Sequence, residues 1–216
     1  MFFSPSPFFM EQQTESQEVS FLDRVYSFVI NGIPKADKPI QLVVNEYRSR
    51  YPDTEKAFKE FIRVQKIKCS TTGFVTGLGG FLTLPVTLPA DLASSLYIEM
   101  RMIAAIAAMR GYNVLEDKVK TLVYVCMVGN TAGDLVKQAG IKAGNQLAAK
   151  KLLPKITGEM IKKINQAVGF RLLTKGGTKG VINIGKAIPL IGGFVGGTYN
   201  LIEVGVFAKR AKAFFD

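Results

Sequence analysis

The sequence predicts an all-α fold, specifically a glycine-rich helical bundle that contains apolar helical hairpins. Apolar residues recur at helical spacing along most of the chain, and 48% of all residues are hydrophobic. Strand-like alternation never lasts beyond a few residues, apart from the ambiguous run 181–184. Of the 21 glycines, 20 fall between Gly73 and Gly205, so the composition changes sharply after the first third of the chain.

Composition divides the chain into three regions. Residues 1–18 are polar and contain prolines, which predicts a flexible N-terminal tail. The first ten residues, MFFSPSPFFM, have no basic segment, so we do not expect a cleavable signal peptide. Residues 19–70 are poor in glycine and read as an amphipathic helical N-terminal region, whereas residues 71–216 form a glycine-rich helical domain.

Three helices are expected in the N-terminal region. The first spans 19–31 and ends at Gly32, and the second spans 38–50 after the turn ADKP. The third opens at Pro52 and Asp53, where Asp53 and Thr54 are candidate N-caps because their side-chain oxygens can accept a hydrogen bond from a free backbone N–H.

An uncharged stretch of 22 residues, 69–90, follows the third helix. This length could span a bilayer. However, the stretch contains four glycines and two prolines, which would break a single straight helix. A buried or interfacial helical hairpin that turns near Gly79 or Pro85 is therefore favoured over a transmembrane span.

Four further helical segments and a final helix are expected in the glycine-rich domain. Residues 89–110 are apolar on most faces and end before Gly111, so this helix should be central. The next segments are 115–138, 142–152 and 157–174, and the chain closes with a basic, aromatic amphipathic helix.

Several classes of enzyme are disfavoured by composition. The chain has no histidine and only two cysteines, Cys69 and Cys126, which we expect to be small buried hydrophobes in a reducing compartment. There is no GxxxxGK[ST] phosphate loop and no GxSxG elbow, and GLGG at 77–80 lacks the full dinucleotide fingerprint. No catalytic residue, cofactor or metal site is therefore predicted, although enzymatic activity stays open.

The net charge of +11 comes almost wholly from one block. Residues 1–136 carry 14 basic and 14 acidic side chains, whereas residues 137–186 carry 11 basic side chains and one acid, Glu159. Lysines that flank apolar helical positions favour an anionic lipid surface, whereas nucleic acid would call for more arginines and aromatics than this block holds. The predicted lipid-binding residues are Lys150, Lys151, Lys155, Lys162 and Lys163.

A second set of candidates consists of polar residues inside otherwise apolar helices. Asp91 and Glu99 lie along one side of the 89–110 helix, whereas Arg101 points elsewhere. Asn130 and Asp134 are spaced to share one face of the 115–138 helix. Buried charges normally pair, so a structural polar network is the plainer interpretation, and a ligand or headgroup site is the functional alternative.

Four segments together resemble the EcsC family of bacterial proteins, which is named for its association with an ABC-type exporter operon. They are TGLGGFLTLPVTLPADLASSLYIEMRMIAAIAAMRGY, VYVCMVGNTAGDLVKQAG, KINQAVGFRLLTKGGTKG and INIGKAIPLIGGFVGGTYN, in colinear order over roughly 70–215. The resemblance implies a bacterial cytoplasmic or membrane-associated helical protein without an established activity. It also draws attention to the positions Asp91, Arg101, Asn130, Asp134, Asn165, Gln166, Arg171, Lys175 and Lys186, without assigning any of them a catalytic role.

Three hypotheses follow. The first is a membrane-associated, lipid-interacting protein at the inner face of the cell membrane, with anionic lipids as its partner. The second is an uncharacterised enzyme that uses the carboxylates of Asp91, Glu99 and Asp134, with or without a divalent cation. The third is an accessory or interaction module of an ABC-type exporter or another membrane protein. The oligomeric state stays open.

Overall fold

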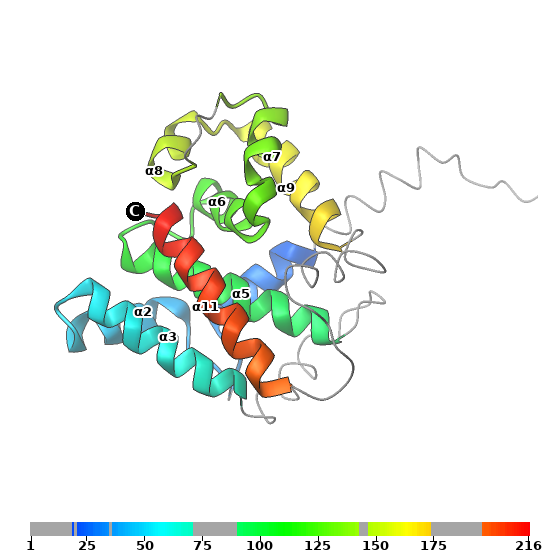
Figure 1. Ribbon diagram of the computed structural model, residues 1–216. Coiled ribbons are helices and arrows are strands. Elements are labelled where there is room, and N and C mark those ends of the chain that lie inside the picture. The colour runs from blue at the N-terminus through cyan, green and yellow to red at the C-terminus, as the bar shows by residue number, and fades with distance from the viewer. Residues whose placement is uncertain (1–18, 20, 35, 71–89, 143–146, 174–195) are drawn as a thin grey trace, which may run out of the picture.

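A computed structural model describes residues 19, 21–34, 36–70, 90–142, 147–173 and 196–216 (Figure 1). Within these ranges the chain forms helices, turns and one isolated bridge between Ile33 and Asp37, which confirms the all-α prediction. Residues 21–31 form the first helix. The next elements are α2 (Ile40–Arg50), α3 (Thr54–Ser70), α5 (Ala90–Met109), α6 (Asp117–Met127), η1 (Gly129–Thr131), α7 (Ala132–Gln138), α8 (Ala149–Leu152), η2 (Leu153–Lys155), α9 (Gly158–Leu173) and α11 (Gly196–Phe214).

Helix α5 is the centre of the fold. It packs against α2, α3, α6 and α11, and residues 101–109 are all buried. Small and flexible side chains in this stretch let several helices approach α5 from different directions. The prediction that this helix is central is confirmed.

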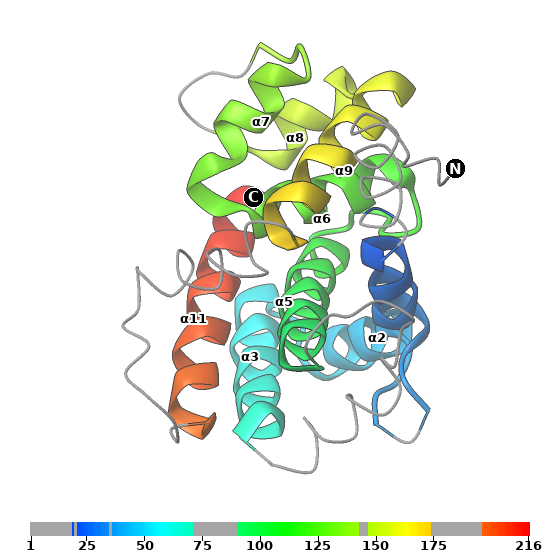
Figure 2. The ribbon, with the colours of Figure 1, turned by 90° about the vertical axis from the view of Figure 1, so that its right-hand side faces the viewer.

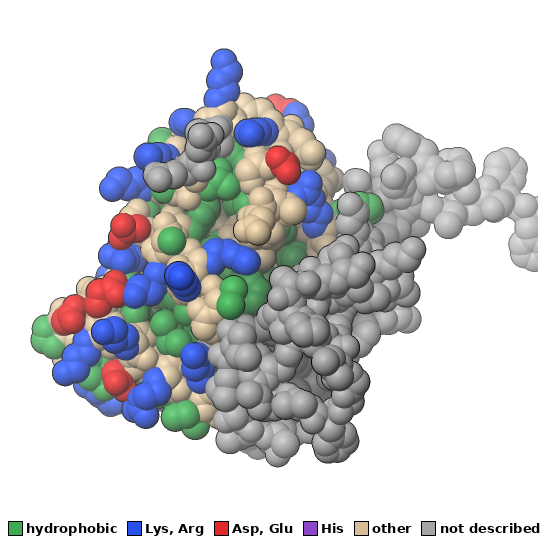
Figure 3. All heavy atoms as spheres, viewed as in Figure 1, with side chains coloured by type: hydrophobic (Ala, Val, Ile, Leu, Met, Phe, Trp, Pro, Cys, Tyr) green, Lys and Arg blue, Asp and Glu red, His purple; other side chains and the backbone are tan. Residues whose placement is uncertain are grey.

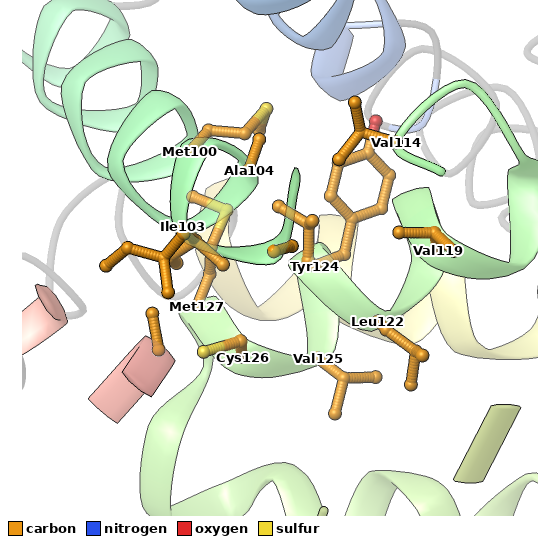
Figure 4. Close-up of a cluster of buried hydrophobic side chains, with 14 of the residues drawn as sticks. Met100, Ile103, Ala104, Val114, Val119, Leu122, Tyr124, Val125, Cys126 and Met127 are labelled. Atoms are coloured by element: carbon orange, nitrogen blue, oxygen red, sulfur yellow. The ribbon is translucent and has the colours of Figure 1, made fainter. Parts of the chain in front are cut away.

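Figure 4 shows a cluster of buried apolar side chains at the contact between α5 and α6. Met100 and Ile103 of α5 lie beside Tyr124 and Met127 of α6. The tyrosine ring is fully buried, and its hydroxyl donates a hydrogen bond to Asp23 at 2.9 Å. An aromatic ring with a satisfied polar end thus joins α6 to the first helix.

The helices are arranged in two groups. Figures 1 and 2 show α3, α5 and α11 running side by side, with α2 beside them, while α7, α8 and α9 gather at the other end of the molecule. Helix α6 lies between the groups, since it packs against α5 on one side and α9 on the other.

One hydrophobic core includes residues from both ends of the chain. Leu22 and Val29 of the first helix and Phe61 of α3 belong to the same cluster as Ile103 of α5 and Phe215, and all five are buried. The regions 19–70 and 71–216 are therefore physically one unit as far as the described residues extend.

The predicted start of α3 and the predicted ends of the first helix and of α5 are confirmed. The Glu55 N–H donates to Asp53 Oδ1 at 3.0 Å, so Asp53 is the N-cap of α3. Gly111 ends α5 with φ of 92°, a left-handed conformation that glycine adopts without strain. Gly32 ends the first helix in the same way, with φ of 78°.

The expectation of one continuous helix over 115–138 is wrong. Helix α6 ends at Met127, and a 3-10 turn separates it from α7. Gly129 adopts φ of 62° at the break. The carbonyl oxygen of Met127 accepts a hydrogen bond from Arg210 Nη1 at 3.3 Å, so a side chain from α11 supplies the partner for a carbonyl at this helix end.

Of the remaining expected segments, some are confirmed, one is shorter than expected and others lie outside the described residues. Helix α9 and the final helix α11 are confirmed, whereas the 142–152 helix is shorter than expected and begins at Ala149. No described helix is both long and apolar enough to cross a bilayer. The N-terminal tail 1–18, the predicted hairpin within 69–90 and the run 181–184 lie outside the described residues, except for the ends of the hairpin stretch.

Candidate functional site

The side chain of Arg101 is 2% exposed and is held by the N-terminal part of the chain. Its Nε lies 3.3 Å from Asp37 Oδ2, in an ion pair of which both side chains are buried. Its Nη1 donates to the carbonyl of Val29 at 3.0 Å, and its Nη2 donates to the carbonyl of Lys38 at 2.7 Å. The guanidinium therefore fixes the end of the first helix and the following turn against α5.

Tyr97, one helical turn before Arg101, completes this cluster. Its hydroxyl donates to the same Asp37 oxygen at 3.1 Å, and the Arg101 guanidinium lies 6.0 Å from its ring centroid. Burial raises the pKa of Tyr97 well above its ordinary value, so the hydroxyl stays protonated and remains a donor at neutral pH. One hydroxyl donor and one cation thus face the buried Asp37 carboxylate, which is the compensation that such a charge requires.

A pocket with a volume of about 450 Å³ opens beside this cluster, between the turn, α2 and α3. Its lining residues are Ala36, Asp37, Lys38, Val43, Glu46, Tyr47, Val64 and Gln65. Two of the lining residues, Lys38 and Glu46, form an exposed ion pair at 3.0 Å.

Gln65 is the unusual member of this pocket. It lies on α3 and the whole residue is only 6% exposed, and no hydrogen bond of its amide is seen among the residues the structure describes. The amide is not one of the buried polar atoms without a partner, so it is reachable from the pocket. The pocket therefore presents a donor and an acceptor that the protein itself leaves unused.

A second candidate site is the basic lobe, which we define as the described residues 129–142 and 147–173, with η1, α7, α8, η2 and α9, at one end of the molecule (Figure 3). Its described residues carry eight basic side chains and two acidic ones, Asp134 and Glu159. The five predicted lipid-binding lysines are all exposed: Lys150, Lys151, Lys155, Lys162 and Lys163. A charge excess of this kind creates an attractive field for anions.

The lysines of the basic lobe differ in their contacts. Lys163 pairs with Glu159 at 2.7 Å, and this pairing lowers the pKa of the glutamate. Lys155 donates to the carbonyl of Lys142 at 3.1 Å, which leaves its charge unneutralised. Lys150, Lys151 and Lys162 form no ion pair within the described part of the chain.

Helix α9 is amphipathic with a basic outer face. Ile164 and Val168 are buried, while Lys162, Lys163 and Phe170 are exposed, the phenylalanine by 45%. Positions 163 and 170 are seven residues apart and so lie on one side of the helix. An aromatic ring between basic side chains is typical of a helix that lies at a membrane surface.

The predicted polar residues are distributed over separate places. Arg101, Glu99 and Asn165 are buried, as expected. Glu99 Oε1 accepts a hydrogen bond from the Ser95 hydroxyl at 3.2 Å, whereas Asn165 Oδ1 has no partner among the described residues.

The expected burial of Asn130 and Asp134 is wrong, because both are exposed. The predicted helix breaks at Gly129, so Asn130 lies in η1 and Asp134 lies in α7. The side of α7 that carries Asp134 points to solvent. Gln166 and Arg171 of α9 are half-buried, and Arg171 Nη1 donates to the carbonyl of Thr131 at 3.1 Å.

The hypothesis of a shared carboxylate site gains no support from the described residues. Glu99 is buried on α5, whereas Asp134 is exposed on α7, which packs on α6 and α9. No group of three or more side chains able to hold a metal ion occurs in the described ranges. The side chain of Asp91 and the residues Lys175 and Lys186 lie outside them.

Sequence reasoning overlooked Asp37, Tyr97 and Gln65. Tyr97 stands four residues before Arg101 on an apolar helix, and this spacing is the signal that could have revealed it. Asp37 belongs to a turn far away in sequence, and Gln65 looks like any polar residue of an amphipathic helix, so neither carries a local signal.

The comparisons with known proteins identify a family. The sequence profile of the EcsC protein family matches residues 50–216, a range that includes Arg101, Gln65 and the whole basic lobe but not Asp37. Comparison with curated proteins finds no match, and comparison with solved structures finds none either. Because the profile matches well over half of the chain, this protein belongs to the EcsC protein family.

Proposed function

We propose that this protein binds the surface of membranes rich in anionic lipids, at the inner face of the cell membrane, through the basic lobe. The observation that carries the proposal is the charge of this lobe, where eight basic side chains face only two acidic ones in the described residues. Lysine stems can lie along the acyl boundary while their ammonium groups reach the phosphates.

The lobe offers both components that a peripheral membrane contact needs. Lys150, Lys151 and Lys162 are exposed and form no ion pair among the described residues, so an approaching phosphate displaces no carboxylate from them. Phe170 on the outer face of α9 supplies an apolar contact. Each lysine near an anionic leaflet contributes at most about 1 kcal/mol, so the affinity must come from several lysines together.

Vesicle flotation tests the proposal. We expect the full chain to float with vesicles that contain phosphatidylglycerol, to float poorly with vesicles of phosphatidylcholine alone, and to be released by high salt because salt screens exposed charges. Failure to float under all of these conditions would contradict the proposal.

Two variants with the same net charge distinguish vesicle binding through the basic lobe from attraction by the charge of the whole protein. Replacement of Lys150, Lys151 and Lys155 by Gln should weaken vesicle binding by up to about a hundredfold, which corresponds to about 1 kcal/mol for each lysine. The control replaces Lys56, Lys59 and Lys209, which are equally exposed but lie on α3 and α11, and leaves the same net charge. An equal loss in both variants would show that the whole protein, and not the lobe, attracts the vesicle.

Native membranes provide an additional arm of the experiment. Binding to stripped native membranes that persists after removal of their proteins supports the lipid contact. Binding that requires those proteins would contradict it, and would favour a protein partner such as an ABC-type exporter.

A further inference from the structure

We infer that the pocket between the turn at 36–38, α2 and α3 is a binding site for a small neutral molecule that carries a carboxamide group on an apolar body. The pocket has a volume of about 450 Å³, within the range of about 300–1,000 Å³ that is usual for small-molecule sites. It lies beside α2 and α3, away from the basic lobe (Figure 1), so the inference is independent of the proposed function.

Gln65 indicates the polar group of the ligand. The residue is only 6% exposed and lines the pocket, and its amide forms no hydrogen bond with the described residues. A primary amide presents a donor and an acceptor side by side in one plane, and its best complement is a second group with the same pair in reverse order. A carboxamide satisfies both atoms at once, whereas a carboxylate can only accept and an ammonium can only donate.

The two carboxylates at the pocket are already paired with cations, which disfavours a cationic ligand. The Glu46 carboxylate is balanced by Lys38 at 3.0 Å and by Arg50 at 3.1 Å. The Asp37 carboxylate is balanced by Arg101, and its side chain is 1% exposed. Neither carboxylate leaves an uncompensated charge for an ionic ligand to neutralise.

The walls specify the body of the ligand. Val43 of α2 and Val64 of α3 supply aliphatic surface, and the ring of Tyr47 supplies aromatic surface. The Tyr47 ring is itself held edge-on against Phe61, with centroids 5.5 Å apart. A flat apolar group fits between such walls, and its burial is favourable.

The pocket is preformed because its turn is fixed from behind. The backbone N–H of Ile33 donates to the carbonyl of Asp37 at 3.0 Å, and the N–H of Asp37 donates to the carbonyl of Ile33 at 2.8 Å. Arg101 holds the Lys38 carbonyl and the Asp37 side chain from α5. A ligand therefore need not order this wall on binding.

Benzamide is the probe, because it joins a carboxamide to a flat apolar ring. In a nitrogen-15 spectrum of the full chain, the side-chain amide of Gln65 gives its own signal, assigned in the unaltered protein through its through-bond connection to the backbone of the same residue. We expect benzamide to shift this signal saturably, with a dissociation constant of about 1 mM for so small a ligand. Benzoate and toluene at the same concentrations should give no saturable shift.

The matched variants are Gln65→Leu and Gln41→Leu. Gln41 lies on the exposed side of α2, where its Nε2 donates to Asn45 Oδ1 at 3.1 Å, away from the pocket. Benzamide affinity, followed through the backbone signals of Val43 and Val64, should fall at least about tenfold in Gln65→Leu and by less than about twofold in Gln41→Leu.

Three outcomes would overturn the inference. They are no saturable shift with benzamide, equal shifts with benzoate or toluene, and unchanged benzamide affinity in Gln65→Leu. The first would mean that water alone fills the pocket. The comparison of the three probes uses the unaltered protein, so it decides the matter even where Gln65→Leu does not fold.

Discussion

The guanidinium carbon of Arg210 lies 2.6 Å from the point at which a Cβ on Gly129 would stand. Arg210 comes from α11, and Gly129 is the residue at which α6 and α7 separate. The same guanidinium donates to the Met127 carbonyl at 3.3 Å and lies 5.1 Å from the ring centroid of Phe207. The close approach of this side chain to the break depends on the absence of a side chain at position 129.

Gly129→Ala should therefore destabilise the protein by about 2–3 kcal/mol, because alanine is strained at a positive φ and displaces the Arg210 guanidinium. Chemical denaturation measures the change. The control is Gly133→Ala within α7, where the nearest atom to a new Cβ is 3.8 Å away and where alanine favours the helix. Equal stability of the two variants would contradict the role of Arg210.

Arg101→Met should cost about 3–5 kcal/mol of unfolding free energy, because it leaves the buried Asp37 carboxylate without its cation and two carbonyls without their donor. The reference is Glu60→Gln, which breaks the exposed ion pair between Arg63 and Glu60 on α3 and should cost less than about 1 kcal/mol. If both variants lose the same small amount, the Arg101 cluster does not hold the turn.

Thr121→Val should stabilise the protein by about 1 kcal/mol. Thr121 of α6 is fully buried, and its hydroxyl has no hydrogen-bond partner among the described residues. Valine has nearly the same shape and removes the unpaired polar group. Thr131→Val is the opposite case, since the Thr131 hydroxyl donates to the Val128 carbonyl at 3.1 Å, and thermal unfolding should show a loss there. A loss in Thr121→Val as well would reveal a partner for its hydroxyl.

Stability should fall at alkaline pH through Cys126. Burial raises the pKa of this thiol from 9.0 to about 12, and the charge of Arg210 lowers it only in part. Since the unfolded chain loses the proton first, the contribution of the thiol is complete below pH 9.0 and is lost as pH rises toward about 12. The slope for one such group is about 1.4 kcal/mol per pH unit.

Comparison with Cys126→Ala isolates the contribution of the thiol to the pH dependence of the unfolding free energy. The tyrosines with raised pKa values remain in both proteins, and they are Tyr26, Tyr97 and Tyr124. Unfolding free energies measured between about pH 8 and pH 10 should fall more steeply with Cys126 present. Parallel curves would mean that the thiol is accessible in the folded state.

The helices predicted correctly are those whose signals are local. Asp53 caps α3 through its own side chain, and Gly111 ends α5 through its own backbone conformation. The break at Gly129 was missed because a glycine within an apolar pattern is common, and the side chain that serves the broken end comes from α11, distant in sequence. Tertiary contacts, not propensity, decide such a position.

The candidate sites show the same division. Exposure of the five lysines was predictable, because lysine side chains are almost never fully buried without a partner. Arg101 was recognised as a buried charge, but its partner Asp37 comes from a turn that shares no helix with it. Asn130 and Asp134 were placed wrongly because i, i+4 spacing says which residues share a face and not which way that face points.

The contacts of Arg101 with Val29 and Lys38 also bear on where this protein can be cut. The family profile begins at residue 50, so a fragment designed from it would lack the first helix, the turn and nearly all of α2. Such a fragment would expose the apolar side of α5 and leave the Arg101 guanidinium without Asp37 and its two carbonyl acceptors, which favours aggregation over folding. The region that matches the family profile is therefore shorter than the region that folds as one unit, and a fragment made for expression should contain the whole of the second.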